Sequence, residues 1–426
     1  MNWQALKIMT LIFLVCVSST KASEKLDDAN SLKALPDYLG YAALNNAQLK
    51  AKFEHWKAAL EQVPQAKALD DPKFTYGYFI KEVETRVGPQ RHKLGIMQMF
   101  PWFGKLEART DIASAQATVA HKQYEATKIK LFQQVKDTFY EYVYLKQATE
   151  IAEENLELLK HFEEVARIKY ETDTATHPDI IRAQVELAKL EDVLRSLKEL
   201  RQPTVTKFNA ILNRTPMSQL PWPQKPTLFR IDIARSKLIE LIIANNPELQ
   251  GLNGEIEVAK GRVELAKKKF FPDVGVGLDW IQTDDASSAG VRDSGKDPLI
   301  LMFSMNIPLW HNSYKAAELQ AKANVSKSVH QKTEVENKTI SRAVKILYDY
   351  EDSQRKTDLY GNTLVPKAEE LLQASETAYK TGKVDFLSLI DAQRMLLKYQ
   401  LDYHRAMTTN QQKLAELEML AGVELQ

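Results

Sequence analysis

The sequence predicts a mainly helical protein with a small β part, built from one unit that occurs twice in the chain. A shift of 200 residues places Pro72 on Pro272, and a shift of 209 places Tyr170 on Tyr379. A period of this length indicates a duplicated, domain-sized unit and not a solenoid of short repeats. In each copy, short segments of alternating apolar and polar residues precede a helical hydrophobic period that continues for roughly seventy residues.

The beginning of the chain, residues 1–22, has the pattern of a secretory signal peptide. A single positive charge, Lys7, precedes an apolar run that is too short to span a bilayer, and small residues follow. The two repeats are then residues 23–201 and 230–426. Five prolines in the linker between them, residues 202–229, predict that no continuous helix crosses it.

The single cysteine, Cys16, lies inside the apolar run of the predicted signal peptide. The mature chain would then contain no thiol for disulfide or thiolate chemistry. Lipid attachment at Cys16 is an alternative to its removal with the signal peptide. The residue before it, Val15, is not the small Gly or Ala of a lipid-attachment site, which favours removal.

Charge and hydropathy restrict the classes of partner. The chain has 57 basic and 56 acidic residues, so we expect no attraction of nucleic acid by the chain as a whole. After the predicted signal peptide, the sequence contains no run of 18 or more apolar residues, and a helical membrane span is therefore not expected. A membrane role would have to use strands.

Each repeat is expected to open with a helix, over residues 35–67 and 231–269, that stops before Pro72 or Pro272. Beyond each proline the period changes to two, which predicts β-hairpins over about 73–100 and 274–307. Strands of about nine residues have the length that a tilted strand needs to cross a bilayer. The alternative is a soluble hairpin whose apolar face packs on the helices. The expected strands are residues 73–81, 94–100, 274–281 and 299–307, with polar loops at 82–91 and 282–296.

Long helices are expected after the hairpins, and a helix of seventy residues would be about 100 Å long. A heptad of apolar residues from Leu131 to Leu159 predicts a coiled-coil seam, and short polar turns lead into return helices with their own heptads. Pro366 should break or kink its helix. The predicted antiparallel helical hairpins consist of residues 105–172 and 178–201 in the first repeat and 312–381 and 385–421 in the second.

The chain resembles the TolC family of outer-membrane efflux proteins over essentially the whole mature sequence. The most specific stretch is Ala374–Ala392, ASETAYKTGKVDFLSLIDA, and the Asp71-Pro72 and Pro272-Asp273 pairs before the strands also match. The resemblance implies a homotrimer with a trimeric α-barrel across the periplasm joined to a 12-stranded transmembrane β-barrel. Independently, the open edges of a four-stranded sheet in lipid require closure across chains.

The resemblance also implies gate residues at the turns between the long helices. One of the family's gate aspartates aligns with Ser388, and its gate arginine aligns with Val384, beside Lys383. A ring of Asp391 carboxylates around a threefold axis is expected. The alternative is that these are solvated turn charges and helix-terminal residues, which acidic groups near a helix start favour by themselves. The predicted gate and pore residues are Asp179, Tyr379, Lys383, Ser388 and Asp391.

No catalytic site is expected. The eight histidines show no metal-binding spacing, and the sequence contains neither a phosphate-binding glycine loop nor a nucleophile elbow. We therefore predict that the protein is not an enzyme and has no cofactor and no metal site. Met302 and Met305 are three positions apart in one strand, so they face opposite sides and are expected to serve packing.

The predicted function is an outer-membrane exit duct of a tripartite efflux pump. The implied partners are a periplasmic membrane-fusion adaptor, an inner-membrane pump of RND or ABC type and outer-membrane lipid, but not nucleic acid. The alternative is a periplasmic coiled-coil scaffold or adaptor without a membrane span, which gives no reason for four bilayer-length strands at duplicated positions. The substrate stays open among drugs, metal ions such as copper, zinc or cobalt, and secreted proteins.

Overall fold

The structure is a computed structural model that describes residues 32–173 and 175–425. The predicted signal peptide, with Cys16, lies outside the described residues. The chain divides into two compact units, and each unit takes segments from both repeats. Among the described residues, one unit contains 32–51, 125–173, 175–247 and 337–425, and the other contains 52–124 and 248–336.

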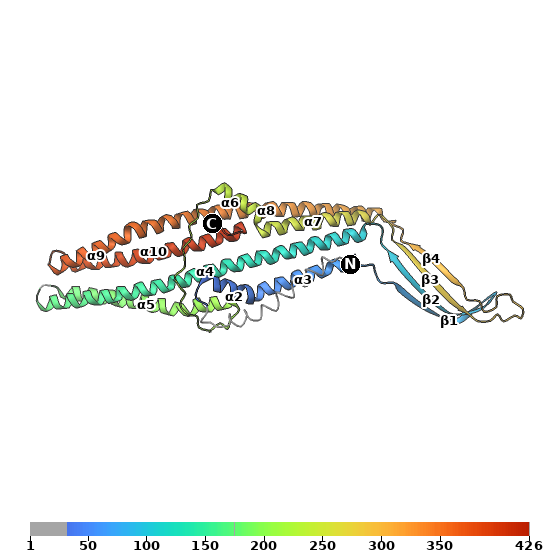
Figure 1. Ribbon diagram of the computed structural model, residues 1–426, viewed down its shortest axis with the longest axis horizontal. Helices are drawn as coiled ribbons and strands as arrows, with labels where there is room; N and C mark the ends of the chain where they lie inside the picture. The colour runs from blue at the N-terminus through green and yellow to red at the C-terminus, as the bar shows by residue number, and fades with distance from the viewer. Residues whose placement is uncertain (1–31, 174, 426) are drawn as a thin grey trace, which may run out of the picture. The chain divides into compact units, whose positions relative to one another are not determined.

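A four-stranded antiparallel sheet lies in the second unit, with its strands in the order β1-β2-β3-β4 (Figure 1). Strands β1 and β2 are longer than predicted. The expected polar loop at 82–91 is wrong, because strand pairing continues until Thr85 meets Gly88. Gly88 has a φ of 131°, which favours glycine, and it lets the chain reverse in a tight turn. The strands are β1 Lys73–Thr85, β2 Gly88–Phe100, β3 Val274–Thr283 and β4 Leu299–Met305.

Four helices join the sheet at the same end, because successive strands run in opposite directions. Helices α3 (Ala47–Lys67) and α7 (Pro247–Lys268) lead into β1 and β3. Helices α4 (Lys105–Glu171) and α8 (His311–Leu359) follow β2 and β4. The connections β1–β2 and β3–β4 therefore lie at the other end of the sheet.

Each predicted opening helix is divided in two at an asparagine. The side-chain amide of Asn46 donates a hydrogen bond to the carbonyl of Ile211 at 2.9 Å, and that of Asn246 donates to the carbonyl of Leu420 at 2.8 Å. Each asparagine thus ties the break in its helix to the end of a return helix. A hydrophobic period does not reveal such a contact. The additional helices are α2 Leu35–Asn45 and α6 Arg235–Asn245.

The long helices form two antiparallel pairs in the first unit, α4 with α5 and α9 with α10 (Figure 1). In the described ranges, the helices hold no segment whose length and hydropathy suit a membrane span. The remaining elements are α5 His177–Leu212, the π-helical turn η2 Tyr360–Leu364, α9 Val365–Lys380 and α10 Phe386–Ala421.

The predicted start of the linker at residue 202 is wrong, because α5 continues through Pro203 to Leu212. Proline inside a helix costs about 3 kcal/mol. Beyond it, however, Val205, Phe208 and Leu212 are all buried, and this apolar burial stabilises the additional turns. The helix ends where Asn213 adopts the left-handed conformation with φ 56°. The non-helical connection to α6 is accordingly residues 213–234.

The predicted interruption near Pro366 is confirmed. The α-helical pattern of α8 gives way to the π-helical turn Tyr360–Leu364, and Pro366 lies in the first turn of α9. A Cβ atom on Gly361 would lie 2.7 Å from the ring of Tyr403. The missing side chain therefore lets α10 approach the π-helical turn closely.

The predicted coiled-coil seam of α4 is confirmed, since its apolar and threonine positions are all buried. The return helices bury most of their heptad positions as well, among them Ile180, Leu190, Leu389 and Leu396. Burial along one stripe of each long helix is the packing that a heptad pattern predicts. The buried seam of α4 consists of Leu131, Val135, Thr138, Tyr142, Leu145, Thr149, Ala152, Leu156 and Leu159.

Candidate membrane surface and gate

One face of the sheet is an apolar surface that continues across all four strands. The register aligns Phe74, Ile96, Leu278 and Leu301 in one row. Phe74 is 69% exposed and Leu301 is 60% exposed. The apolar face therefore does not pack on helices in this structure, as a soluble hairpin would require. The next row consists of Tyr76, Leu94, Trp280 and Leu299.

The opposite face of the sheet, called the polar face below, carries small and polar residues together with Ile281, Ile300 and three methionines. Asp279 is buried on this face, and its carboxylate pairs with the ammonium group of Lys93 at 2.5 Å. A Cβ on the neighbouring Gly95 would lie 2.3 Å from an oxygen of Asp279, so the buried carboxylate needs a glycine beside it. The sheet thus has one lipid-like face and one polar face, the alternation found in membrane strands.

The turn between α4 and α5 uses Asp179 to cap a helix. The Asp179 carboxylate accepts hydrogen bonds from the backbone N–H of Thr176 at 3.1 Å and from the Thr176 hydroxyl at 2.8 Å. Arg182 donates to the same carboxylate at 3.3 Å. These bonds stabilise the first turn of α5. The structure therefore shows Asp179 in a capping role, and its role in a gate stays a prediction.

The turn between α9 and α10 also uses a carboxylate as a cap, but here Asp385 precedes the helix. The Asp385 carboxylate accepts from the backbone N–H of Ser388 at 2.9 Å and from its hydroxyl at 2.6 Å. These hydrogen bonds lower the pKa of Asp385. Gly382, with φ 72°, makes the turn, and the backbone N–H of Lys383 donates to Ala378 at 2.8 Å. The side chain of Lys383 is exposed.

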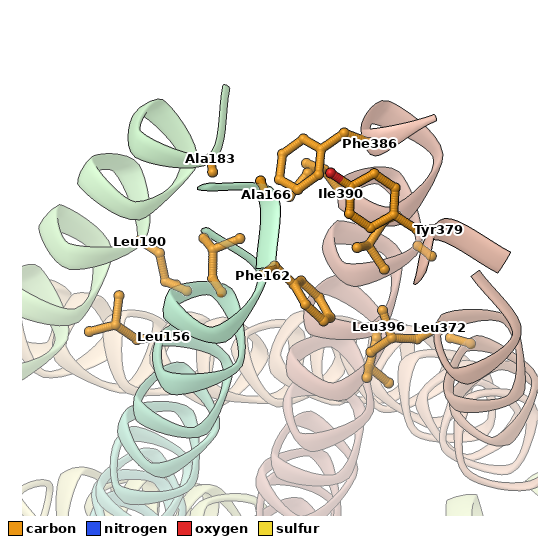
Figure 2. Packing of buried hydrophobic residues seen from close by; sticks show 14 of the residues in the cluster. Leu156, Phe162, Ala166, Ala183, Leu190, Leu372, Tyr379, Phe386, Ile390 and Leu396 are labelled. Carbon is orange, nitrogen blue, oxygen red and sulfur yellow. The ribbon is translucent and has the colours of Figure 1, made fainter. Parts of the chain in front are cut away.

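Tyr379 is buried where the two helical hairpins pack together. Figure 2 shows its ring beside Phe386 of α10, with Phe162 and Ala166 of α4 facing them. The ring centroids of Tyr379 and Phe386 are 5.4 Å apart. The ammonium group of Lys169 lies 4.6 Å from the Tyr379 ring centroid and donates to its backbone carbonyl. The Tyr379 side chain therefore holds the second turn against the first hairpin.

The hydroxyl of Tyr379 makes no hydrogen bond with the described residues. Burial raises the pKa of Tyr379 to about 12, and the negative charge of Asp179 acts in the same direction. The Tyr379 hydroxyl therefore stays protonated, and the charge that acts on it is that of Asp179, another predicted gate residue. An unbonded buried hydroxyl is costly. The ring of Tyr379 therefore stabilises this packing, and its hydroxyl does not.

Asp391 is 58% exposed and pairs with Arg394 of the same helix at 3.0 Å. The Arg394 guanidinium also binds Glu186 of α5 through two hydrogen bonds, at 3.0 and 2.5 Å. These hydrogen bonds lower the pKa of Glu186. The link between α5 and α10 was not predicted. Opposite charges about two turns into each return helix are the only sequence signal for it.

Hard metal sites are not evident in the part of the chain that the structure describes. Its histidine, cysteine, aspartate and glutamate side chains form no group of three or more that suits a metal ion. Of the predicted gate residues, the structure brings Asp179 near Tyr379. It leaves Lys383 and Asp391 exposed and places Ser388 in the cap of α10.

The comparison with protein families gives a match over both repeats. A sequence model described as outer membrane efflux protein matches residues 39–214 and 238–423. These two segments correspond to the two copies of the repeated unit and together cover more than half of the chain.

Individual proteins resemble the chain over most of its length. Nodulation protein T from Rhizobium leguminosarum bv. viciae is 21% identical over 385 residues, which cover 87% of this chain and 78% of that protein. The structure of CusC is similar with a TM-score of 0.77 at 14% identity, covering 91% of this chain and 92% of CusC. The open state of the MtrE outer membrane channel from Neisseria gonorrhoeae gives a TM-score of 0.75 at 16% identity, with coverage of 92% and 90%. The two structures share the fold with this chain.

Proposed function

We propose a role for each part of this chain in the outer membrane channel of a tripartite efflux system. The chain belongs to the outer membrane efflux protein family. The family is one of channels and not of enzymes, and its fold implies a trimer that spans the outer membrane and extends into the periplasm. In our proposal, the apolar face of the sheet contacts outer-membrane lipid, and the polar face lines the exit path. The helical hairpins continue this path into the periplasm.

The exposed apolar rows of the sheet support the membrane assignment most directly. Strands β1 and β4 are the two open edges of the sheet. Unpaired backbone groups at such edges are too costly in hydrocarbon, so the edges must pair with those of other copies. Three copies supply twelve strands for one closed sheet. The row from Phe74 to Leu301 in one copy would then continue into the same row of the next copy and form a continuous lipid-facing belt.

A charge placed on either face of the sheet tests this proposal. Leu278→Arg, on the apolar face, should lower stability by about 2–4 kcal/mol near the bilayer midplane and reduce the trimer band in mild detergent. Thr75→Arg is the matched control, because its row contains Asp279 on the polar face. Equal trimer yield and outer-membrane fractionation for both variants and the unmodified protein would contradict lipid contact.

Labelling of single cysteines tests the direction in which the channel lies. The described residues contain no cysteine, and Cys16 is predicted to leave with the signal peptide, so an introduced cysteine should be the only thiol of the mature chain. Ser288→Cys, in the exposed β3–β4 connection, should react with an impermeant maleimide on whole cells. Thr381→Cys, in the exposed turn after α9, should react only after the outer membrane is opened. The reverse pattern would contradict the proposed topology.

We further propose that the helical turns form the periplasmic gate. Asp391 has the exposure that a pore-lining carboxylate needs, and three copies would create a field that attracts cations. Lys383 is exposed in the same turn. Asp179, Tyr379 and Ser388 would act on the gate by holding the turns in place, since their side chains serve caps and packing.

The selectivity of the purified channel in a planar bilayer tests the pore role of Asp391. Asp391→Asn should lower its preference for cations over anions. Glu370→Gln is the matched control, because Glu370 is an exposed acid that pairs with Lys367 on α9. If the two variants give the same selectivity as the unmodified channel, the constriction lies elsewhere.

The same turns are the proposed docking surface for a periplasmic membrane-fusion adaptor, behind which lies an inner-membrane pump of RND or ABC type. Ile168, Tyr170 and Ile181 are exposed near the first turn, and apolar side chains of this kind support protein contact. Cross-linking in cells from a photoreactive residue at Tyr170 should yield an adaptor adduct. A yield equal to that from Glu157, farther along α4, would contradict docking at the turn.

A further inference from the structure

Methionines gather on the polar face of the sheet. Met97 of β2 pairs with Gly277 of β3, and Gly277 pairs in turn with Met302 of β4. Residues that pair across an antiparallel ladder share one face. The side chain of Met97 lies over Gly277, since a Cβ there would be 3.4 Å from the Met97 methyl group. The Met97 side chain therefore extends over β3, the strand that lies between Met97 and Met302.

The neighbouring row adds a third methionine and a hydroxyl. Met99 pairs with Gly275, which pairs with Ser304. The Ser304 hydroxyl donates toward the sulfur of Met97 at 3.6 Å and toward that of Met99 at 4.0 Å. A Cβ on Gly275 would lie 2.6 Å from the Met99 sulfur and 3.6 Å from the Met97 sulfur. Both sulfurs therefore converge on the space that this glycine leaves open.

The charges on this face are unsuited to a hard cation. The carboxylate of Asp279 is already paired with Lys93 at 2.5 Å, and Lys73 begins the Met97 row in β1. Mg²⁺ and Ca²⁺ require oxygen ligands, and Zn²⁺ prefers imidazole or thiolate. Thioethers are neutral and soft, and they select Cu⁺ among the first-row metals.

We propose that Met97, Met99 and Met302 form a binding site for a soft monovalent cation, Cu⁺ or Ag⁺. The site needs only a small movement of side chains, because methionine is flexible and two glycines leave space around it. Its role as a point of contact for such cargo along the exit path rests on the proposed channel function. Binding itself does not depend on that function.

Titration calorimetry of the purified full-length protein with Ag⁺ tests the site. The unmodified protein should show saturable binding, and the double variant Met97→Leu/Met99→Leu should lose it. Leucine conserves the side-chain volume of methionine, so the sheet should still assemble. Met305→Leu is the matched control, because Met305 lies on the apolar face and is 58% exposed. Its binding should equal that of the unmodified protein, and Zn²⁺ should give no saturable heat.

Three results would overturn the inference: no saturable Ag⁺ binding by the unmodified protein, undiminished binding by the double variant, or equal loss in Met305→Leu. X-ray absorption of the Ag⁺ complex should show sulfur neighbours, and a shell of oxygen or nitrogen alone would also overturn it. Conductance of the same preparations in planar bilayers separates the two proposals. A conducting channel without Ag⁺ binding removes only this site, whereas a preparation that binds Ag⁺ but never conducts counts against the proposed function.

Discussion

The two helical turns are built from aligned residues, but they exchange the members of the pair that caps the following helix. In the first turn, the hydroxyl of Thr176 precedes the helix and the carboxylate of Asp179 reaches back to it. In the second turn, the carboxylate of Asp385 precedes the helix and Ser388 donates to it. A hydroxyl and a carboxylate three residues apart can cap a helix in either order. Capping therefore gives Asp179 and Asp385 the same structural role, although they are not at aligned positions.

What distinguishes the turns is the tyrosine that precedes each of them. Tyr379 is buried against the first hairpin, whereas the aligned Tyr170 is 44% exposed and contacts His177 at a ring-centroid distance of 5.7 Å. The backbones of the turns are alike, since Asp173 and the aligned Gly382 both have positive φ, 56° and 72°. The tyrosine of the second turn is thus buried in the packing between the hairpins, whereas that of the first turn remains partly exposed and accessible to another surface.

The largest expected effect concerns this pair of tyrosines. Tyr379→Ala removes a buried ring and should lower the free energy of local opening of the second turn by about 3 kcal/mol. Tyr170→Ala should change that of the first turn by less than about 1 kcal/mol. Hydrogen exchange of the amides in α9 and α5 measures both values. Similar losses for the two variants would mean that the turns are equally anchored.

Tyr379→Phe sharpens the same comparison. Because the buried hydroxyl makes no hydrogen bond with the described residues, its removal should leave local stability unchanged or raise it. A loss comparable with that of Tyr379→Ala would show that the hydroxyl has a partner in the assembled protein.

A smaller effect is expected from the exchanged capping pair. Asp179→Ala removes the carboxylate that accepts from Thr176 and should cost about 1 kcal/mol of local stability in the first turn of α5. Ser388→Ala, at the aligned position, should cost less, because the Asp385 carboxylate still accepts from the backbone N–H of residue 388. Hydrogen exchange at the first turns of α5 and α10 distinguishes the two. An equal cost would contradict the exchanged roles.

The smallest effect concerns the ion pair between the hairpins. Glu186→Gln should cost about 0.5–1 kcal/mol, because Arg394 is partly exposed and solvent screens the pair. The folded pKa of Glu186 is lowered from its usual 4.5. The pair therefore contributes above that pH, and its contribution is lost as the pH falls below 4.5 through the lowered pKa. The difference in local stability of α5 and α10 between Glu186→Gln and the unmodified protein should disappear in that acidic range. A difference that persists at lower pH would contradict the pKa shift.

Patterns of fixed period predicted the main elements of the fold. Period two located the four strands and their apolar face, and the heptad from Leu131 to Leu159 located the seam of α4, because both depend on neighbours within one element. The end of α5 was missed, since Pro203 is tolerated only because residues beyond it find a core. The tight turn at Gly88 was missed because residues 82–91 are mostly polar and were interpreted as a loop. They are the ends of β1 and β2, which need not be apolar.

The candidate site was less accessible from the sequence. Alignment of the repeats located both turns, but it could not distinguish the buried Tyr379 from the exposed Tyr170. Whether a residue is buried depends on the segments that pack against it, and these differ between the two turns. The contact between Glu186 and Arg394 joins residues 208 positions apart, and no local pattern reports it. The methionine site depends on the register of three strands, whereas spacing within β4 alone indicated packing.

We propose that the buried ring of Tyr379 keeps the gate closed at the second helical turn, and that the exposed Tyr170 does not do so at the first. Single-channel conductance in planar bilayers tests it most directly, with Tyr379→Ala compared with Tyr170→Ala under the same salt. We expect a raised conductance for Tyr379→Ala and the conductance of the unmodified channel for Tyr170→Ala. Equal conductances for the two variants, whether raised or unchanged, would contradict it.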